Sequence, residues 1–113
     1  MRQARPMQVH TFTAAGAITA GRFIGTDQAQ ATLGVNAYGV ANTDAALGDD
    51  LAGTTHGTAI VEAGAAIAAG ALVQADADGK AITRTTGAIL GRLAPGESAT
   101  AAGLFVEVIL INN

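Results

Sequence analysis

The sequence predicts an all-β fold, a small β-sandwich or β-barrel built from two similar halves, with an extended N-terminal arm. Three observations support this prediction. Short runs of apolar and β-branched residues alternate with glycine-containing turns. No segment has the periodicity of an amphipathic helix. One stretch of the sequence also occurs twice along the chain, which indicates an internal repeat.

The repeat pairs residues 11–27 with residues 60–76. Six aligned positions are identical: Ala14/Ala63, Ala17/Ala66, Ile18/Ile67, Ala20/Ala69, Gly21/Gly70 and Asp27/Asp76. We therefore expect two similar half-domains, about residues 11–58 and 60–111, packed into a single β domain of residues 9–113.

An alanine-rich helix is the alternative interpretation of the second copy, because alanine is the best helix former. Gly64 and Gly70 fall inside this segment, and a glycine in a helix interior costs about 1 kcal/mol. The first copy has glycines of its own, Gly16 and Gly21. Two tight bends followed by a short strand therefore fit both copies better than a helix does.

The composition predicts a thin hydrophobic core. The 113 residues suit one domain, half of them are hydrophobic, and only 4% are aromatic. Alanine, which supplies much of the apolar half, offers little area to bury at about 25 cal/mol per Å². We therefore expect further burial against copies of the chain or against a partner.

Charge and cysteine content exclude several classes of function. The net charge of -3 argues against general binding to nucleic acid or to an anionic membrane. The absence of cysteine excludes disulfides, thiolate chemistry and cysteine-ligated zinc. Glycine or polar residues interrupt every apolar run before it reaches the length of a membrane-spanning helix.

The first half of the chain begins with residues 1–8, which hold Arg2, Arg5 and Pro6 and show no periodicity. We expect them to form an extended arm, which is either a frayed terminus or a segment that orders against a neighbouring subunit or an acidic surface. Strands are expected at residues 9–13, 22–26 and 37–41. Residues 42–50, NTDAALGDD, are expected to form a polar loop.

The second half has strands expected at residues 54–62, 71–75, 80–83 and 87–93, with turns at residues 76–79 and 94–96. Its last stretch, residues 104–111, has the sequence LFVEVILI, and Glu107 is its only charged residue. Both faces of such a strand are apolar, and at an exposed edge it would promote aggregation. We therefore expect this strand to be central in its sheet or covered by another chain.

No motif for catalysis or for cofactor or metal binding occurs in the sequence. The run DADGK at residues 76–80 begins like a calcium loop, but Lys80 falls at a ligand position and Gly87 at the place of the required glutamate. His10 and His56 stand alone in the sequence, without the spacing of a metal site. The phosphate-binding motifs and the GxSxG motif of serine hydrolases are absent. We therefore predict no catalytic, cofactor-binding or metal-binding residues.

The spacing of glycine and alanine resembles that of a known family. The run GTAIVEAGAAIAAGALVQADADGKAITRTTGAILGRL at residues 57–93, its weaker first copy AAGAITAGRFIGTD and the C-terminal FVEVILI are similar to the capsid decoration (cement) proteins of tailed bacteriophages. The resemblance implies a non-enzymatic structural virion protein. Such a protein sits on the outside of the phage head, bridges major capsid subunits and is in the host cytoplasm before assembly.

The resemblance also implies partners and contact residues. The implied partners are the major capsid protein and further copies of the chain, as a homotrimer rather than a homodimer, with no nucleic acid and no membrane. As capsid or subunit contacts we expect Arg2, Arg5 and Pro6 of the arm and, on the last strand, Phe105, Ile109 and Ile111. A carbohydrate-binding or adhesion module is the alternative, but such modules usually display clusters of Trp or Tyr, and this chain has no Trp and one Tyr.

Overall fold

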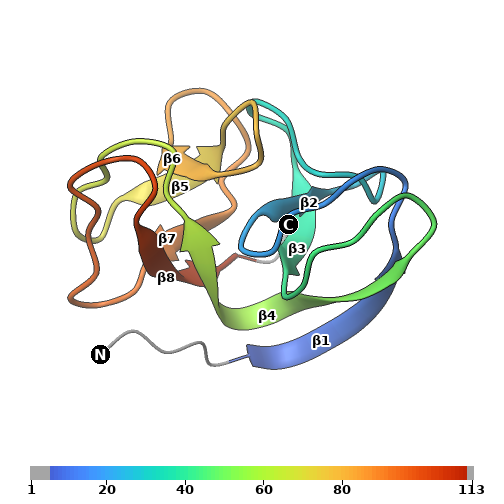
Figure 1. The fold of residues 1–113 in the computed structure, drawn as a ribbon. Helices are drawn as coiled ribbons and strands as arrows, with labels where there is room; N and C mark the ends of the chain where they lie inside the picture. The colour runs from blue at the N-terminus through green and yellow to red at the C-terminus, as the bar shows by residue number, and fades with distance from the viewer. Residues whose placement is uncertain (1–5, 112–113) are drawn as a thin grey trace.

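The computed structural model describes residues 6–111. These residues contain eight β-strands, joined by turns and loops, and no helix (Figure 1). The strands are β1 (Pro6–Thr13), β2 (Phe23–Gly25), β3 (Ala37–Ala41), β4 (Asp50–Glu62), β5 (Leu72–Ala75), β6 (Ala81–Thr83), β7 (Gly91–Leu93) and β8 (Phe105–Leu110). The prediction of an all-β fold is confirmed. Since these residues form no helix, none of them belongs to a helix long and apolar enough to cross a membrane.

The strands form one antiparallel sheet in the order β2-β3-β4-β8-β7-β5-β6, and β1 pairs with β4 outside this path. The long strand β4 pairs with β1 through its first part and with β8 through its last part. It bends sharply in Figure 1. Gly57, at the junction of the two parts, has a φ of 91°, which glycine adopts at little cost.

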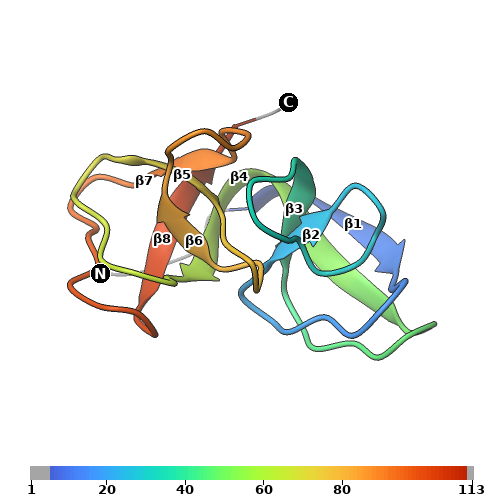
Figure 2. The same ribbon diagram turned by 90° about the horizontal axis from the view of Figure 1, so that it is seen from above.

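The bend in β4 divides the molecule into two halves that share this strand. Seen from above, β1, β2 and β3 lie on one side and β5 to β8 on the other, with β4 running between them (Figure 2). The boundary expected between the two copies, near residues 58–60, therefore falls inside a strand.

The two halves have equivalent strand pairings. Phe23 of β2 pairs with Val40 of β3, and Leu72, the equivalent of Phe23 in the second copy, pairs with Arg92 of β7. The last part of β4 is the equivalent of β1 in the second copy. It pairs with β8 in the way that β1 pairs with the first part of β4. The repeat in the sequence thus corresponds to a repeat in the sheet.

The repeated Ala-Gly segments form the bends that the sequence predicts. Ile18 and Ile67 each exchange two backbone hydrogen bonds, of 2.8 and 2.9 Å, with an alanine of a later loop. Gly21 and Gly70 have φ values of 79° and 73°, in the left-handed region that favours glycine. An α-helical interpretation of these segments is therefore wrong.

Two clusters of buried side chains form the core. The larger cluster lies mainly in the second half and includes Val61, Val106 and Val108, all 0% exposed. The smaller cluster, in the first half, includes Ile24 and Leu51. Phe23 and Ile24 of β2 point in opposite directions, as successive residues of a strand do. Phe23 therefore belongs to the larger cluster and Ile24 to the smaller one.

Three strand boundaries differ from the predicted ones. Strand β1 begins at Pro6, so residues 6–8, expected in the arm, pair with β4, while residues 1–5 lie outside the described residues. Strand β4 begins at Asp50, because residues 50–53 pair with β1 despite their loop-like composition. Strand β7 begins only at Gly91, because the backbone before it bonds to Gly34 and to the side chain of Gln74.

Candidate contact surface

The six predicted contact residues lie in two places along the chain. Arg2 and Arg5 fall outside the described residues. Pro6 opens β1 opposite Gly57 of β4. The other three lie on the last strand: Phe105 and Ile109 in β8, and Ile111 just after it.

Strand β8 is central in the sheet, as the sequence predicts, with β4 on one side and β7 on the other. Val106 and Val108 face the core and are fully buried. Phe105 and Ile109 point to the opposite face, because side chains alternate along a strand, and there they are 43% and 40% exposed. Glu107 lies between them on this face and is buried (7%), so the exposed area that this face offers to a partner comes mainly from Phe105 and Ile109.

Phe105 forms one wall of an open hollow of about 360 Å³. The hollow is lined by residues from both halves, namely Ala20, Gly21, Ala41, Asn42, Ile60 and Phe105. A Cβ atom placed on Gly21 would lie 3.0 Å from Cε2 of Phe105, so the ring packs directly on the bend. The name "β8 surface" refers below to Phe105, Ile109 and Ile60.

The β8 surface is flanked by a small ionic cluster. Glu62, which pairs with Phe105 across the sheet, accepts from Arg22 at 3.4 Å and lies 3.6 Å from Nζ of Lys80. The other two described basic side chains, Arg84 and Arg92, donate to backbone carbonyls within the chain. All four described cations are therefore engaged inside the molecule rather than gathered in a basic patch.

A second hollow, of about 290 Å³, lies beside β1 and brings together residues that are far apart in sequence. His10, Phe12, Tyr38, Thr55 and His56 line it. The rings of Phe12 and Tyr38 stack with their centroids 5.8 Å apart, and that of His10 follows at 6.3 Å from Phe12. No sequence pattern indicates this grouping, because it depends on the register of β1 against β4.

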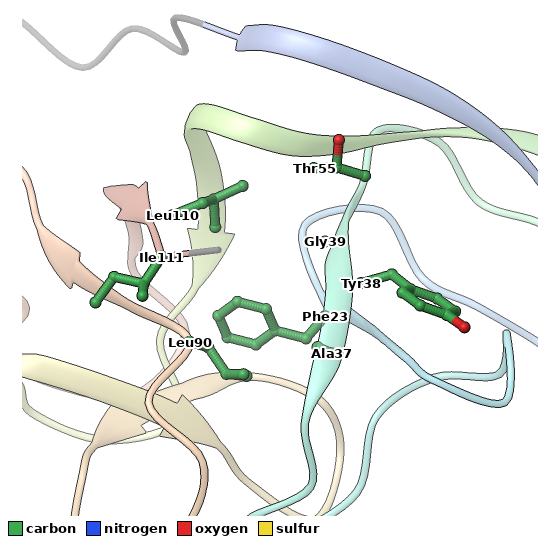
Figure 3. Close-up of a pocket in the computed structure, with 8 residues that line it drawn as sticks. All are labelled: Phe23, Ala37, Tyr38, Gly39, Thr55, Leu90, Leu110 and Ile111. Carbon is green, nitrogen blue, oxygen red and sulfur yellow. The ribbon is translucent and has the colours of Figure 1, made fainter. Parts of the chain in front are cut away.

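The third hollow is too small to be a ligand site. It lies on the other side of β3 from the Tyr38 ring, where Phe23 points toward Leu90 and Leu110 (Figure 3). Its volume is about 10 Å³, roughly what one water molecule requires. The packing of Phe23 is therefore part of the core.

No group of three or more His, Asp or Glu side chains suited to a metal occurs among residues 6–111. The calcium-like run at residues 76–80 is a turn, as predicted. Oδ1 of Asp76 accepts from the backbone N–H groups of Asp78 and Lys80, at 2.8 and 2.9 Å. Gly79 completes the turn with a φ of 77°.

These features define a small all-β protein whose central strand β8 carries two partly exposed apolar side chains, Phe105 and Ile109, on one face. The fold is that of a solved phage structure, the crystal structure of the head fiber gp8.5 N base in bacteriophage phi29. The two match with a TM-score of 0.74 and 22% sequence identity, over 92% of this chain and 95% of that one. No curated protein sequence matches the chain.

The family model described as phage cement protein matches residues 2–110. The chain therefore belongs to the phage cement protein family, a family of structural proteins of the phage head, as its glycine and alanine spacing indicates. Among the contact residues expected from the sequence, Phe105 and Ile109 lie partly exposed on β8, which is fixed in the centre of the sheet.

Proposed function

We propose that this protein is a non-enzymatic capsid decoration protein that binds the outside of the phage head and stabilises contacts between major capsid proteins. It would be made in the host cytoplasm and would join the shell as a closed homo-oligomer, with three copies rather than two. The observation that carries the proposal is the exposure of Phe105 and Ile109 on a central strand. Family membership supports the association with capsid proteins.

The β8 surface has the properties of a protein contact. Large apolar side chains on a rigid strand lose little conformational freedom on binding, and burying them removes apolar area from water at about 25 cal/mol per Å². Glu62 and its two cations border the surface and supply a polar rim. A contact of this kind excludes water from its centre, where the buried Glu107 already accepts from the hydroxyl of Thr58 at 2.7 Å, and keeps the Glu62 cluster at its edge.

The arm adds a second contact in this proposal. Arg2 and Arg5 form charge-assisted hydrogen bonds to carboxylates of a neighbouring subunit. Pro6 starts β1, which anchors the arm to the body through pairing with β4. Once the body has docked, the arm meets its partner at a high effective concentration. Nucleic acid and membrane are not partners in this proposal.

Substitution at Ile109 tests the β8 surface. Ile109→Lys places a charge at the centre of the contact, and we expect it to reduce occupancy on purified capsids at least about tenfold. Leu47→Lys is the matched control, because Leu47 is an exposed apolar residue (74%) in a loop far along the chain from β8. Equal occupancy of the two variants, both folded, would remove the β8 surface from the proposal.

A carbohydrate-binding role is a second candidate that one observation favours. Tyr38 is half exposed and stacks on Phe12 beside the 290 Å³ hollow, so one ring face is available to a sugar ring. Glycan-array binding that is lost in Tyr38→Ala but kept in Ile109→Lys would establish this role. Absence of binding to any glycan would leave the capsid contact as the function.

A further inference from the structure

Glu107 places a carboxylate at the centre of the β8 surface. Phe105 and Ile109 flank it on the same face of β8, because side chains alternate along a strand, and Ile60 lies directly opposite it on β4. Glu107 is only 7% exposed, whereas Phe105 and Ile109 are 43% and 40% exposed. Three apolar side chains therefore surround one acidic group.

One side-chain hydrogen bond within the chain holds this carboxylate. Oε2 of Glu107 accepts from the hydroxyl of Thr58, on the same face of β4, at 2.7 Å. No hydrogen bond or ion pair within residues 6–111 reaches Oε1. Among the described side chains, the only nitrogen or oxygen atom that is both fully buried and unpaired is Nε of Arg22. Oε1 of Glu107 is therefore accessible to solvent between its apolar neighbours.

No cation of the described residues neutralises Glu107. All four described cations contact either Glu62 or a backbone carbonyl. A second carboxylate is adjacent instead, since Oε1 of Glu97 accepts from the backbone N–H of Glu107 at 2.7 Å. A buried charge without a countercharge costs free energy, and a like charge beside it adds to that cost. A cation supplied from outside the chain removes this cost.

We propose that the major capsid protein presents a lysine or arginine side chain to Glu107 when the two proteins bind. This partner chemistry rests on the proposed function, in which the β8 surface is the capsid contact. The positively charged head pairs with Oε1, and the methylene stem packs on Phe105, Ile109 and Ile60. A ring of apolar side chains around an anion matches both parts of such a side chain.

The pair makes the contact selective as well as strong. A capsid subunit that covers the β8 surface removes the remaining water from around Glu107, and an unpaired carboxylate would then oppose binding. A cation at this place turns that cost into an attraction that salt screens little. An apolar or acidic side chain at the same place is rejected. The apolar ring thus supplies the buried area, and Glu107 determines which partner fits.

Removal of the charge without a change of shape tests the proposal. Glu107→Gln keeps an acceptor for the hydroxyl of Thr58, and we expect its affinity for purified capsids to fall about tenfold or more. Asp50→Asn is the matched control, because Asp50 accepts from the hydroxyl of Thr13 at 3.0 Å and is exposed in the other part of β4. Equal affinities of the two variants would overturn the proposal.

The stability of the isolated protein separates a docking role from a structural one. Because Glu107 carries a charge that no described cation neutralises, Glu107→Gln should leave the melting temperature unchanged or raise it. A melting temperature below that of Asp50→Asn would show that the carboxylate serves the fold, and the docking role would then be wrong.

Electron microscopy of decorated capsids identifies the group that lies over Glu107 without any substitution. We expect a lysine or arginine nitrogen of the major capsid protein within about 4 Å of Oε1. An apolar side chain at this place, or a cation from another copy of this chain, would contradict the proposal.

Failure of this proposal is distinguishable from failure of the proposed function. If Ile109→Lys loses occupancy but Glu107→Gln binds as well as Asp50→Asn, the β8 surface remains the contact and only the cation is wrong. If Ile109→Lys binds capsids as well as Leu47→Lys does, the β8 surface is not the contact, and the cation proposed for Glu107 fails with it.

Discussion

Asp27 and Asp76, which occupy equivalent positions in the two copies of the repeat, perform the same task in the two halves. Oδ1 of each accepts a hydrogen bond from the backbone N–H two residues later, at 3.1 Å for Asp27 and 2.8 Å for Asp76. Aspartate commonly closes turns in this way. The aspartate at these two equivalent positions therefore serves to close a turn. No metal is needed to explain why both copies have it.

The two turns differ in how much they contribute to stability. Asp76 also accepts from Lys80, whereas Asp27 is exposed and closes its turn with one such bond. We expect Asp76→Ala to lower the free energy of unfolding by about 2 kcal/mol and Asp27→Ala by less than about 1 kcal/mol. Urea denaturation of both variants checks this order, and the reverse order would contradict it.

The packing of Phe105 on Gly21 can be tested by comparing alanine substitutions at Gly21 and Gly70. Both have positive φ, so alanine costs about 1 kcal/mol at either position. Only at Gly21 would the new Cβ meet a neighbour, Phe105, whereas nothing lies within 4 Å at Gly70. Gly21→Ala should therefore destabilise the protein more than Gly70→Ala in thermal unfolding. The difference should disappear when both are made in a Phe105→Leu background.

Gln74 is a buried polar group that holds one loop in place. It is 2% exposed, and its Oε1 accepts from the N–H of Thr85, the hydroxyl of Thr85 and the N–H of Gly87. Gln74→Leu leaves these donors without a partner, and we expect a loss of about 3 kcal/mol in the free energy of unfolding. Gln30→Leu is the control, because Gln30 is less buried and accepts from the N–H of Thr19. Equal effects on the midpoint of urea unfolding would show that the loop does not depend on Gln74.

The arm of the proposed capsid contact is tested by charge removal. Arg2→Gln with Arg5→Gln should lower occupancy on capsids at low salt and bring it near to that of the unaltered protein at high salt, where exposed charges are screened. Arg84→Gln with Arg92→Gln, which removes two charges from the body, is the matched control. Occupancy independent of the two arginines across the salt series would show that the arm makes no such contact.

The sequence predicts individual strands better than their boundaries. Strand β3 matches residues 37–41, and β8 lies within residues 104–111, because β-branched and apolar residues mark both. The start of β4 differs from the prediction, because Asp49 and Asp50 indicate a loop where the backbone pairs with β1. Local composition does not report pairing partners that are distant in the sequence.

The candidate surface is predicted only in part for the same reason. The apolar pattern of the last strand identifies Phe105 and Ile109, which are both partly exposed. Ile60 joins them only through the register of β4 with β8. The grouping of His10 with His56 depends in the same way on the register of β1 with β4.

Strand β4 also determines how the molecule carries mechanical load. Its single backbone belongs to both halves, so no flexible linker connects the part held by β1 to the part held by β8. A pull that separates the halves along β4 acts in series on its hydrogen bonds to β1 in one half and to β8 in the other, rather than on a hinge that extends first. The two halves therefore behave as one element under tension, although their sequences repeat.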